Sequence, residues 1–121
     1  MVLVDTSIWI DHFNRKDPVL DYLLNDYKVV IHPFILSELA CGNFKNRNLI
    51  ISYLKSLPVV SIISDNEYYS FIDQNKLFGI GLGFVDVHIL AATILSRTLL
   101  FTRDKTLLVR AQLAGVDFKS E

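Results

Sequence analysis

Four acidic residues stand apart from other charges in this sequence. Asp5, Glu38 and Asp86 are each the only formal charge within a stretch of ten or more residues, and Asp104 lies three residues after an apolar run that ends at Phe101. Charged side chains are almost never fully buried unless they are paired or bound to a cation. These four positions are therefore the first candidates for a site that carries chemistry.

Four carboxylates brought together repel one another, so that either their pKa values rise or cations bind between them. A set of oxygen ligands without a His/Cys cluster suits Mg²⁺ or Mn²⁺ better than zinc. Such ions can activate a water and stabilise the leaving oxygen of a phosphodiester. We expect Asp5, Asp86 and Asp104 to hold one or two ions, directly or through water, and Glu38 to position the second ion or the attacking water.

Each acid, taken alone, has a simpler structural interpretation. Asp5 and Asp104 could cap the helices that follow them, and Asp86 could sit in a first helical turn, where the helix dipole favours an anion. Glu38 could pair with a lysine. The joint pattern favours the metal site, because all four residues map to one end of one predicted sheet.

The elements that must position these acids alternate between short strands and helices. Apolar runs predict strands at residues 2–4, 29–31, 59–61 and 99–101, with a further edge strand at 116–118. Capping residues and apolar spacing predict helices at residues 6–13, 18–26, 33–42, 49–57, 65–78, 85–96 and 105–114. Strands that alternate with helices form a parallel sheet covered on both faces, and ligands bind beyond the carboxyl ends of its strands.

Composition excludes several classes of protein. The chain has 121 residues with a net charge of −1, which excludes a strongly basic protein that coats nucleic acid. Its single cysteine, Cys41, excludes an intramolecular disulfide framework and makes a reducing cytoplasm the default. We expect Cys41 to be a small buried apolar residue rather than a nucleophile. The apolar stretch 77–96 holds Asp86 near its middle, so we expect no membrane span.

Basic residues flank the proposed site. Without the four site acids, nine acids face 12 bases, so the remaining surface is mildly positive. Such residues could follow a nucleic-acid backbone, although each one alone could simply be a solubilising charge. The possible RNA contacts are Arg15, Lys16, Lys45, Arg47, Lys76, Arg103 and Lys105.

These motifs resemble the PIN-domain ribonuclease family and, within it, the VapC-type toxins of toxin–antitoxin pairs. The resemblance covers nearly the whole chain and rests on the segments 2–7, 36–39, 85–92 and 102–105. It implies one PIN-like domain over residues 1–121, folded as a three-layer α/β/α sandwich with a central, mainly parallel sheet. It also implies that Asp5, Glu38, Asp86 and Asp104 form the catalytic, metal-binding cluster, with Thr6 and Thr102 as supporting residues.

The implied activity is that of a Mg²⁺- or Mn²⁺-dependent endoribonuclease toxin, which cleaves RNA by metal-activated water in the cytoplasm. The implied partners are the RNA substrate, a cognate antitoxin that covers the acidic site, and a second copy in a homodimer. The apolar segment 49–57 could support that dimer or belong to the core. Residues 79–83 form a glycine-rich loop, in which relatives often carry a basic residue where this chain has Ile80.

Other functions stay open on the sequence alone. The chain could be a housekeeping RNA-processing PIN nuclease, or a noncatalytic PIN-fold module that only binds RNA or protein. Four intact acids argue against the noncatalytic module, because their repulsion without a cation would only destabilise the fold. A receiver-type phosphoacceptor domain needs adjacent acids after the first strand, but Asp5 is followed by Thr6. We expect His88 to be a core histidine, since on a helix it points away from Asp86.

Overall fold

The structure, a computed structural model, describes residues 1–120 and is built around a short parallel sheet. Its strands are β1 (Val2–Val4), β2 (Val29–Val30) and β3 (Leu99–Phe101), in the order β2-β1-β3. The central strand β1 pairs in parallel with both neighbours. Isolated parallel bridges from Ile31 to Val59 and from Leu100 to Asp117 continue the pairing beyond the strands.

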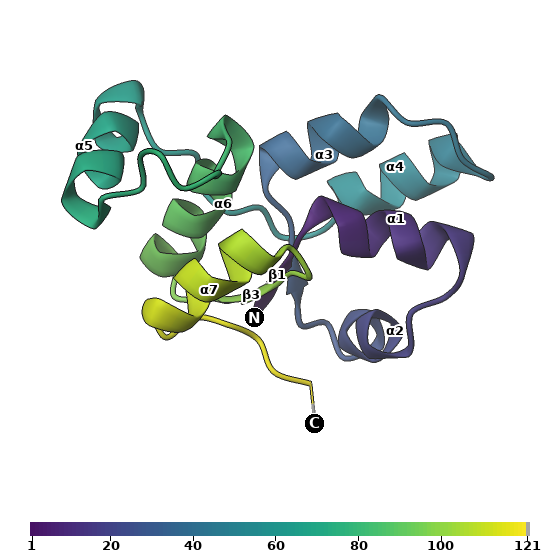
Figure 1. The fold of residues 1–121 in the computed structure, drawn as a ribbon. Coiled ribbons are helices and arrows are strands. Elements are labelled where there is room, and N and C mark those ends of the chain that lie inside the picture. The colour runs from purple at the N-terminus through teal and green to yellow at the C-terminus, as the bar shows by residue number, and fades with distance from the viewer. Residues whose placement is uncertain (121) are drawn as a thin grey trace.

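Helices cover the sheet from both sides, as predicted for an α/β sandwich. In Figure 1, α1 to α4 lie on the right of the sheet, and α5 to α7 lie on the left. The helices are α1 (Thr6–Asn14), α2 (Pro18–Asn25), α3 (Pro33–Ala40), α4 (Arg47–Lys55), α5 (Asp65–Asn75), α6 (Phe84–Leu95) and α7 (Lys105–Leu113). The fold is therefore the α/β sandwich of a PIN-like protein.

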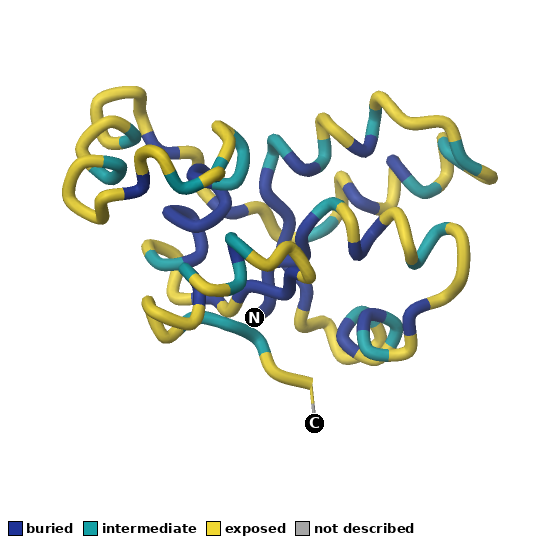
Figure 2. The backbone as a smooth tube through the Cα atoms, in the orientation of Figure 1, coloured by how far each residue is buried: buried dark blue, intermediate teal, exposed yellow. Residues whose placement is uncertain are grey.

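The sheet and the inner faces of the helices form the core. All three residues of β1 are buried, and Figure 2 shows the buried segments gathered at the centre of the molecule. A strand buried on both faces needs an apolar residue at every position, which explains why β1 reads Val-Leu-Val without alternation. The apolar helix α6 supplies the largest share of buried helical residues, including His88 with 1% of its surface exposed.

The predicted helix boundaries are correct where a local capping signal sets them. Asp17 caps α2 through Val19 and Leu20, with Pro18 as the first helical residue. Ser64 and Glu67 form the reciprocal capping box expected for α5. At other helix ends the boundaries were misplaced by one to three residues.

Left-handed backbone explains two of these differences. The helix predicted for residues 49–57 begins earlier, at Arg47, because Asn46 adopts a left-handed conformation with φ 59° before it. The helix predicted to reach residue 78 ends at Asn75, because Lys76 adopts φ 52°. The strand predicted at residues 59–61 is reduced to the single bridge at Val59.

Two smaller expectations concern Cys41 and the membrane. The prediction of a buried Cys41 was wrong, since this residue lies exposed at the carboxyl end of α3. Within residues 1–120, no helix combines the length and apolar character needed to cross a membrane. The helix that contains Asp86 has 12 residues.

Candidate active site

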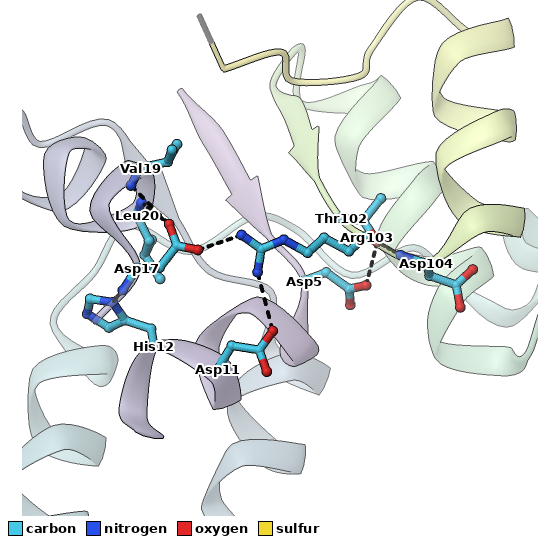
Figure 3. A network of polar contacts seen from close by, with 9 residues as sticks. All are labelled: Asp5, Asp11, His12, Asp17, Val19, Leu20, Thr102, Arg103 and Asp104. Atoms are coloured by element: carbon cyan, nitrogen blue, oxygen red, sulfur yellow. Dashed lines mark hydrogen bonds and ion pairs between the residues drawn. The ribbon is translucent and has the colours of Figure 1, made fainter. Parts of the chain in front are cut away.

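Asp5 occupies the centre of the candidate site, directly after the central strand. Its backbone N–H donates to the Phe101 carbonyl at 2.9 Å, which continues the pairing of β1 with β3. Only 8% of its surface is exposed. The Thr6 N–H donates to Oδ1 at 2.8 Å. The Thr102 hydroxyl donates to Oδ2 at 2.7 Å, as Figure 3 shows. The carboxylate is therefore held by both backbone and side chains.

The pKa of Asp5 depends on its burial, its hydrogen bonds and the charges of neighbouring acids. Burial raises this pKa above its ordinary value, while the hydrogen bonds from Thr102 and Thr6 oppose the rise. The negative charges of Asp86 and Asp104 raise it further, and the net shift is upward. Three of the four predicted acids thus lie close enough to share one electrostatic field.

Asp86 and Asp104 are each anchored to the first turn of a helix. Asp86 Oδ2 accepts the Gly83 N–H at 3.2 Å at the start of α6. Asp104 is the N-cap of α7, and its Oδ1 accepts the Leu107 N–H at 2.9 Å. The other carboxylate oxygen of each residue accepts no hydrogen bond within residues 1–120.

The capping interpretation is therefore correct for Asp5, Asp86 and Asp104, and it explains how a cluster of acids can persist. These residues lie at the amino ends of α1, α6 and α7. The partial positive charge at a helix amino end stabilises an anion there. Three helix amino ends offset part of the repulsion, and Asp86 and Asp104 each keep one free oxygen for a ligand.

Glu38 joins the site from α3 through Thr6. The Thr6 hydroxyl donates to Glu38 Oε1 at 2.9 Å, while the Thr6 backbone N–H binds Asp5. The alternative that Glu38 pairs with a lysine was wrong, since within the described residues no basic side chain forms an ion pair with it. Thr6 and Thr102, the two predicted supporting residues, both donate to a site acid.

The chemistry of these donors fits a hard divalent cation. All four side chains offer oxygen, and no Lys or Arg within residues 1–120 neutralises any of them. As they stand, however, no three His, Cys, Asp or Glu side chains in the described part of the chain are grouped closely enough to hold an ion. A bound ion would have to draw the free oxygens of Asp86 and Asp104 toward Asp5.

Three of the predicted RNA contacts are instead engaged within the protein. The Arg103 guanidinium bridges Asp17 at 2.5 Å and Asp11 at 3.3 Å, which ties the loop after β3 to α1 and to the start of α2 (Figure 3). Burial raises the pKa of Asp17, but the hydrogen bonds and charge of Arg103 outweigh it, so the pKa lies below its ordinary value. Lys16 pairs with Asp21 at 3.3 Å.

Arg47 closes the carboxyl end of α3. Its guanidinium donates to the carbonyl oxygens of Ala40 and Gly42. The other four predicted RNA contacts are exposed and form no ion pair within the described chain. They are Arg15, Lys45, Lys76 and Lys105.

Two histidines without a sequence signal have defined structural roles. His12 Nδ1 accepts the backbone N–H of Asp17 at 2.9 Å, which supports the residue that binds Arg103. His32 caps α3, where its Nδ1 accepts the Phe34 N–H at 2.9 Å. Burial, together with the neighbouring His88, lowers the pKa of His32 to about 4. Short-range sequence patterns do not reveal these contacts, because histidine is not among the common capping residues.

An aromatic cluster around His88 was also missed. Phe34, Tyr68 and Phe84 surround the buried His88, with ring centroids 4.6 to 4.8 Å from it. The available signal was the spacing of two of these rings from site acids. Phe34 precedes Glu38 by four residues, and Phe84 precedes Asp86 by two.

Fold and site together define an α/β sandwich of the PIN type, with carboxylates at the carboxyl edge of its sheet. No family model matches the chain. Two relatives do: Ribonuclease VapC32 of Mycobacterium tuberculosis strain CDC 1551 / Oshkosh and that of strain ATCC 25618 / H37Rv. Each is 35% identical over 122 residues, which cover 100% of this chain and 98% of the relative. The chain therefore belongs to the VapC-type family of PIN-domain toxins.

Proposed function

We propose that this protein is a metal-dependent endoribonuclease and the toxin of a toxin–antitoxin pair. The carrying observation is the shared field of Asp5, Asp86 and Asp104 at three helix amino ends, with no basic side chain of the described residues paired to them. Acids arranged in this way favour a divalent cation. The printed name of both relatives, ribonuclease, supports RNA as the substrate.

The site residues would have separate roles in metal binding and in positioning. Asp5, Asp86 and Asp104 would hold Mg²⁺ or Mn²⁺. The ion would supply the positive charge that activates a water and stabilises the negative charge on the leaving oxygen. Thr102 fixes Oδ2 of Asp5, so the central carboxylate keeps one orientation. Thr6 fixes Oε1 of Glu38, which leaves Oε2 to accept a proton from the attacking water. The expected RNA ends are a 5′-phosphate and a 3′-hydroxyl.

Basic residues that have no partner in the described chain would contact phosphates of the RNA. Arg15, Lys45, Lys76 and Lys105 are the four candidates. Lys16, Arg47 and Arg103 would act indirectly, by holding the elements around the site in place. Four of the seven basic residues would therefore bind RNA, and three would stabilise the elements around the site.

The proposed partners are a cognate antitoxin that covers the acids and a second copy of the chain, both in the cytoplasm. On α4, Ile51 and Leu54 are buried, whereas Leu49 and Tyr53 are 74% and 46% exposed. The apolar segment therefore belongs partly to the core, and its outer face is available to a second copy. Size-exclusion chromatography with light scattering tests the homodimer, and a monomer at all concentrations would contradict it.

Cleavage of total RNA with and without EDTA tests the proposed activity. The wild-type protein is expected to cut RNA in Mg²⁺ or Mn²⁺ and to stop in EDTA. Asp86→Asn should abolish cleavage, whereas the matched control Asp73→Asn, at an exposed position of α5, should cut like the wild type. Cleavage that survives EDTA, or products with a 2′,3′-cyclic phosphate, would contradict the metal-activated water.

A further inference from the structure

Two aromatic rings lie on the helices that carry Glu38 and Asp86. Phe34 precedes Glu38 by one helical turn in α3, so both side chains share a face of that helix. Phe84 and Asp86 belong to the first turn of α6. The Phe34 and Phe84 rings stack at 5.6 Å with an interplanar angle of 24°. This pair of rings therefore bridges the two helices beside the candidate site.

The side chains of His88 and Tyr68 hold the Phe34 and Phe84 rings in place. His88 is 1% exposed, and its ring contacts Phe84 at 4.6 Å and Phe34 at 4.8 Å. Tyr68 stacks on His88 at 4.7 Å and contacts Phe84 at 5.2 Å. Although these neighbours fix it, the Phe84 side chain is 56% exposed. An exposed ring with little freedom left to lose is well suited to bind a flat ligand.

We propose that Phe84, supported by Phe34, is a stacking platform for an unpaired RNA base next to the scissile phosphate. Proteins bind single-stranded RNA by stacking its bases on aromatic side chains, and every base offers such a face. The inference rests on the proposed ribonuclease activity and adds to it a residue that positions the substrate.

The position on the helices that carry Glu38 and Asp86 favours an aromatic contact over a basic one. A lysine or arginine on these helices would add a positive charge that competes with the divalent ion. Stacking on Phe84 adds affinity for RNA without neutralising any carboxylate. It also holds the substrate next to the acids, where the phosphates are otherwise repelled.

Binding of a short single-stranded RNA in EDTA tests the platform without cleavage. The probe carries 2-aminopurine, whose fluorescence falls when it stacks, at successive positions along the strand. The wild-type protein should bind the probe and quench it at one position. Phe84→Leu keeps an apolar side chain but removes the ring, and should weaken binding roughly 5- to 150-fold, the range for loss of one base–aromatic stack, and abolish the quenching.

Two further variants complete the test. Phe84→Trp keeps a ring and should retain binding and quenching, which also separates the platform from a loss of folding in Phe84→Leu. Phe78→Ala is the matched control, because Phe78 is 64% exposed and belongs to no aromatic pair of the described residues. This variant should bind and quench like the wild type.

The outcomes separate the platform from the proposed function. If the wild type cleaves RNA in Mg²⁺ but Phe84→Leu binds and quenches normally, the platform is overturned and the ribonuclease stands. If Phe84→Leu binds RNA normally but no longer binds the antitoxin, the ring serves a protein partner and the inference is again overturned. If the wild type neither binds nor cleaves RNA, the proposed function itself fails and the platform with it.

Discussion

The Thr102 hydroxyl donates a 2.7 Å hydrogen bond to Asp5 Oδ2 across 97 positions of sequence. The oxygen of that hydroxyl, Thr102 Oγ1, accepts the backbone N–H of Asp104 at 3.1 Å. One hydroxyl thus connects the acid after β1 with the acid that begins α7. A donor that holds a metal-binding carboxylate in place affects the metal as well as the fold.

Replacing this hydroxyl tests its role. Thr102→Val removes the donor that lowers the pKa of Asp5, so this pKa should rise further, and the acid limb of the cleavage rate should move to higher pH. Cleavage at neutral pH should fall roughly 10–100-fold, the usual effect of losing such a support. Thr93→Val is the matched control: Thr93 is buried and donates to the Ile89 carbonyl, far from the acids. An unchanged pH profile in Thr102→Val would contradict the role of Thr102.

The central carboxylate should limit stability when no metal is present. The pKa of Asp5 in the folded protein lies above its ordinary value of 3.8, so the folded state binds the proton more tightly than the unfolded state. The wild type therefore loses stability as pH rises from 3.8 through the raised pKa. Asp5→Asn keeps an oxygen that can accept the Thr6 N–H and does not titrate.

We therefore expect Asp5→Asn to abolish cleavage and, in EDTA, to gain stability over the wild type as pH rises through this range. Urea unfolding at several pH values measures the difference. A loss of about 2–5 kcal/mol in Asp5→Asn, as large as that for a core cavity, would instead favour a purely structural role for this acid.

Glu38 should matter for activity far more than for stability. Glu38→Gln keeps an oxygen that can accept the Thr6 hydroxyl but removes the negative charge. Cleavage should fall roughly 10²- to 10⁴-fold, the range for loss of a positioned base, while the free energy of unfolding changes by less than about 0.5 kcal/mol. Glu67→Gln, also exposed, keeps the capping box of α5 and should cut RNA normally. Equal activity of the two variants would remove Glu38 from the site.

The ion pairs of Arg103 should stabilise the fold. Arg103→Ala leaves the buried Asp17 carboxylate without its partner, and should cost about 1–3 kcal/mol of unfolding free energy at neutral pH. The pKa of Asp17 is lowered in the folded state, so the stabilisation is present above 3.8 and is lost as pH falls through the lowered pKa. The cost of Arg103→Ala should therefore shrink in acid.

A surface pair offers the comparison for Arg103. Lys16 pairs with Asp21, and their side chains are 70% and 33% exposed. Lys16→Ala should change the unfolding free energy by about 0–1 kcal/mol. If Arg103→Ala costs no more than Lys16→Ala, Arg103 is free to contact RNA, as first predicted from its position.

Local patterns in the sequence predicted most of the fold. The strands at residues 2–4 and 99–101 follow from continuous apolar runs, and α2 and α5 follow from the caps Asp17 and Ser64. The start of α4 was misplaced because it depends on the left-handed backbone of Asn46, which no short pattern indicates.

Long-range partners could not be predicted in the same way. Arg103 was expected to be an RNA contact, but it pairs with Asp11 and Asp17, which lie 92 and 86 positions away. The contacts of Phe34 with Phe84 likewise depend on how α3 and α6 meet. The isolation of the acids could be read from the sequence because it is a property of short segments, whereas the partners of each acid are a property of the folded chain.

The pairing of β1 with β3 also fixes when the site can form during protein synthesis. Asp5 emerges from the ribosome early, but its neighbours Thr102 and Asp104 are translated about a hundred codons later. Until this later segment has been synthesised, the nascent chain therefore carries no assembled acids. A ribonuclease of this design can become active only after the segment with Thr102 and Asp104 has been synthesised.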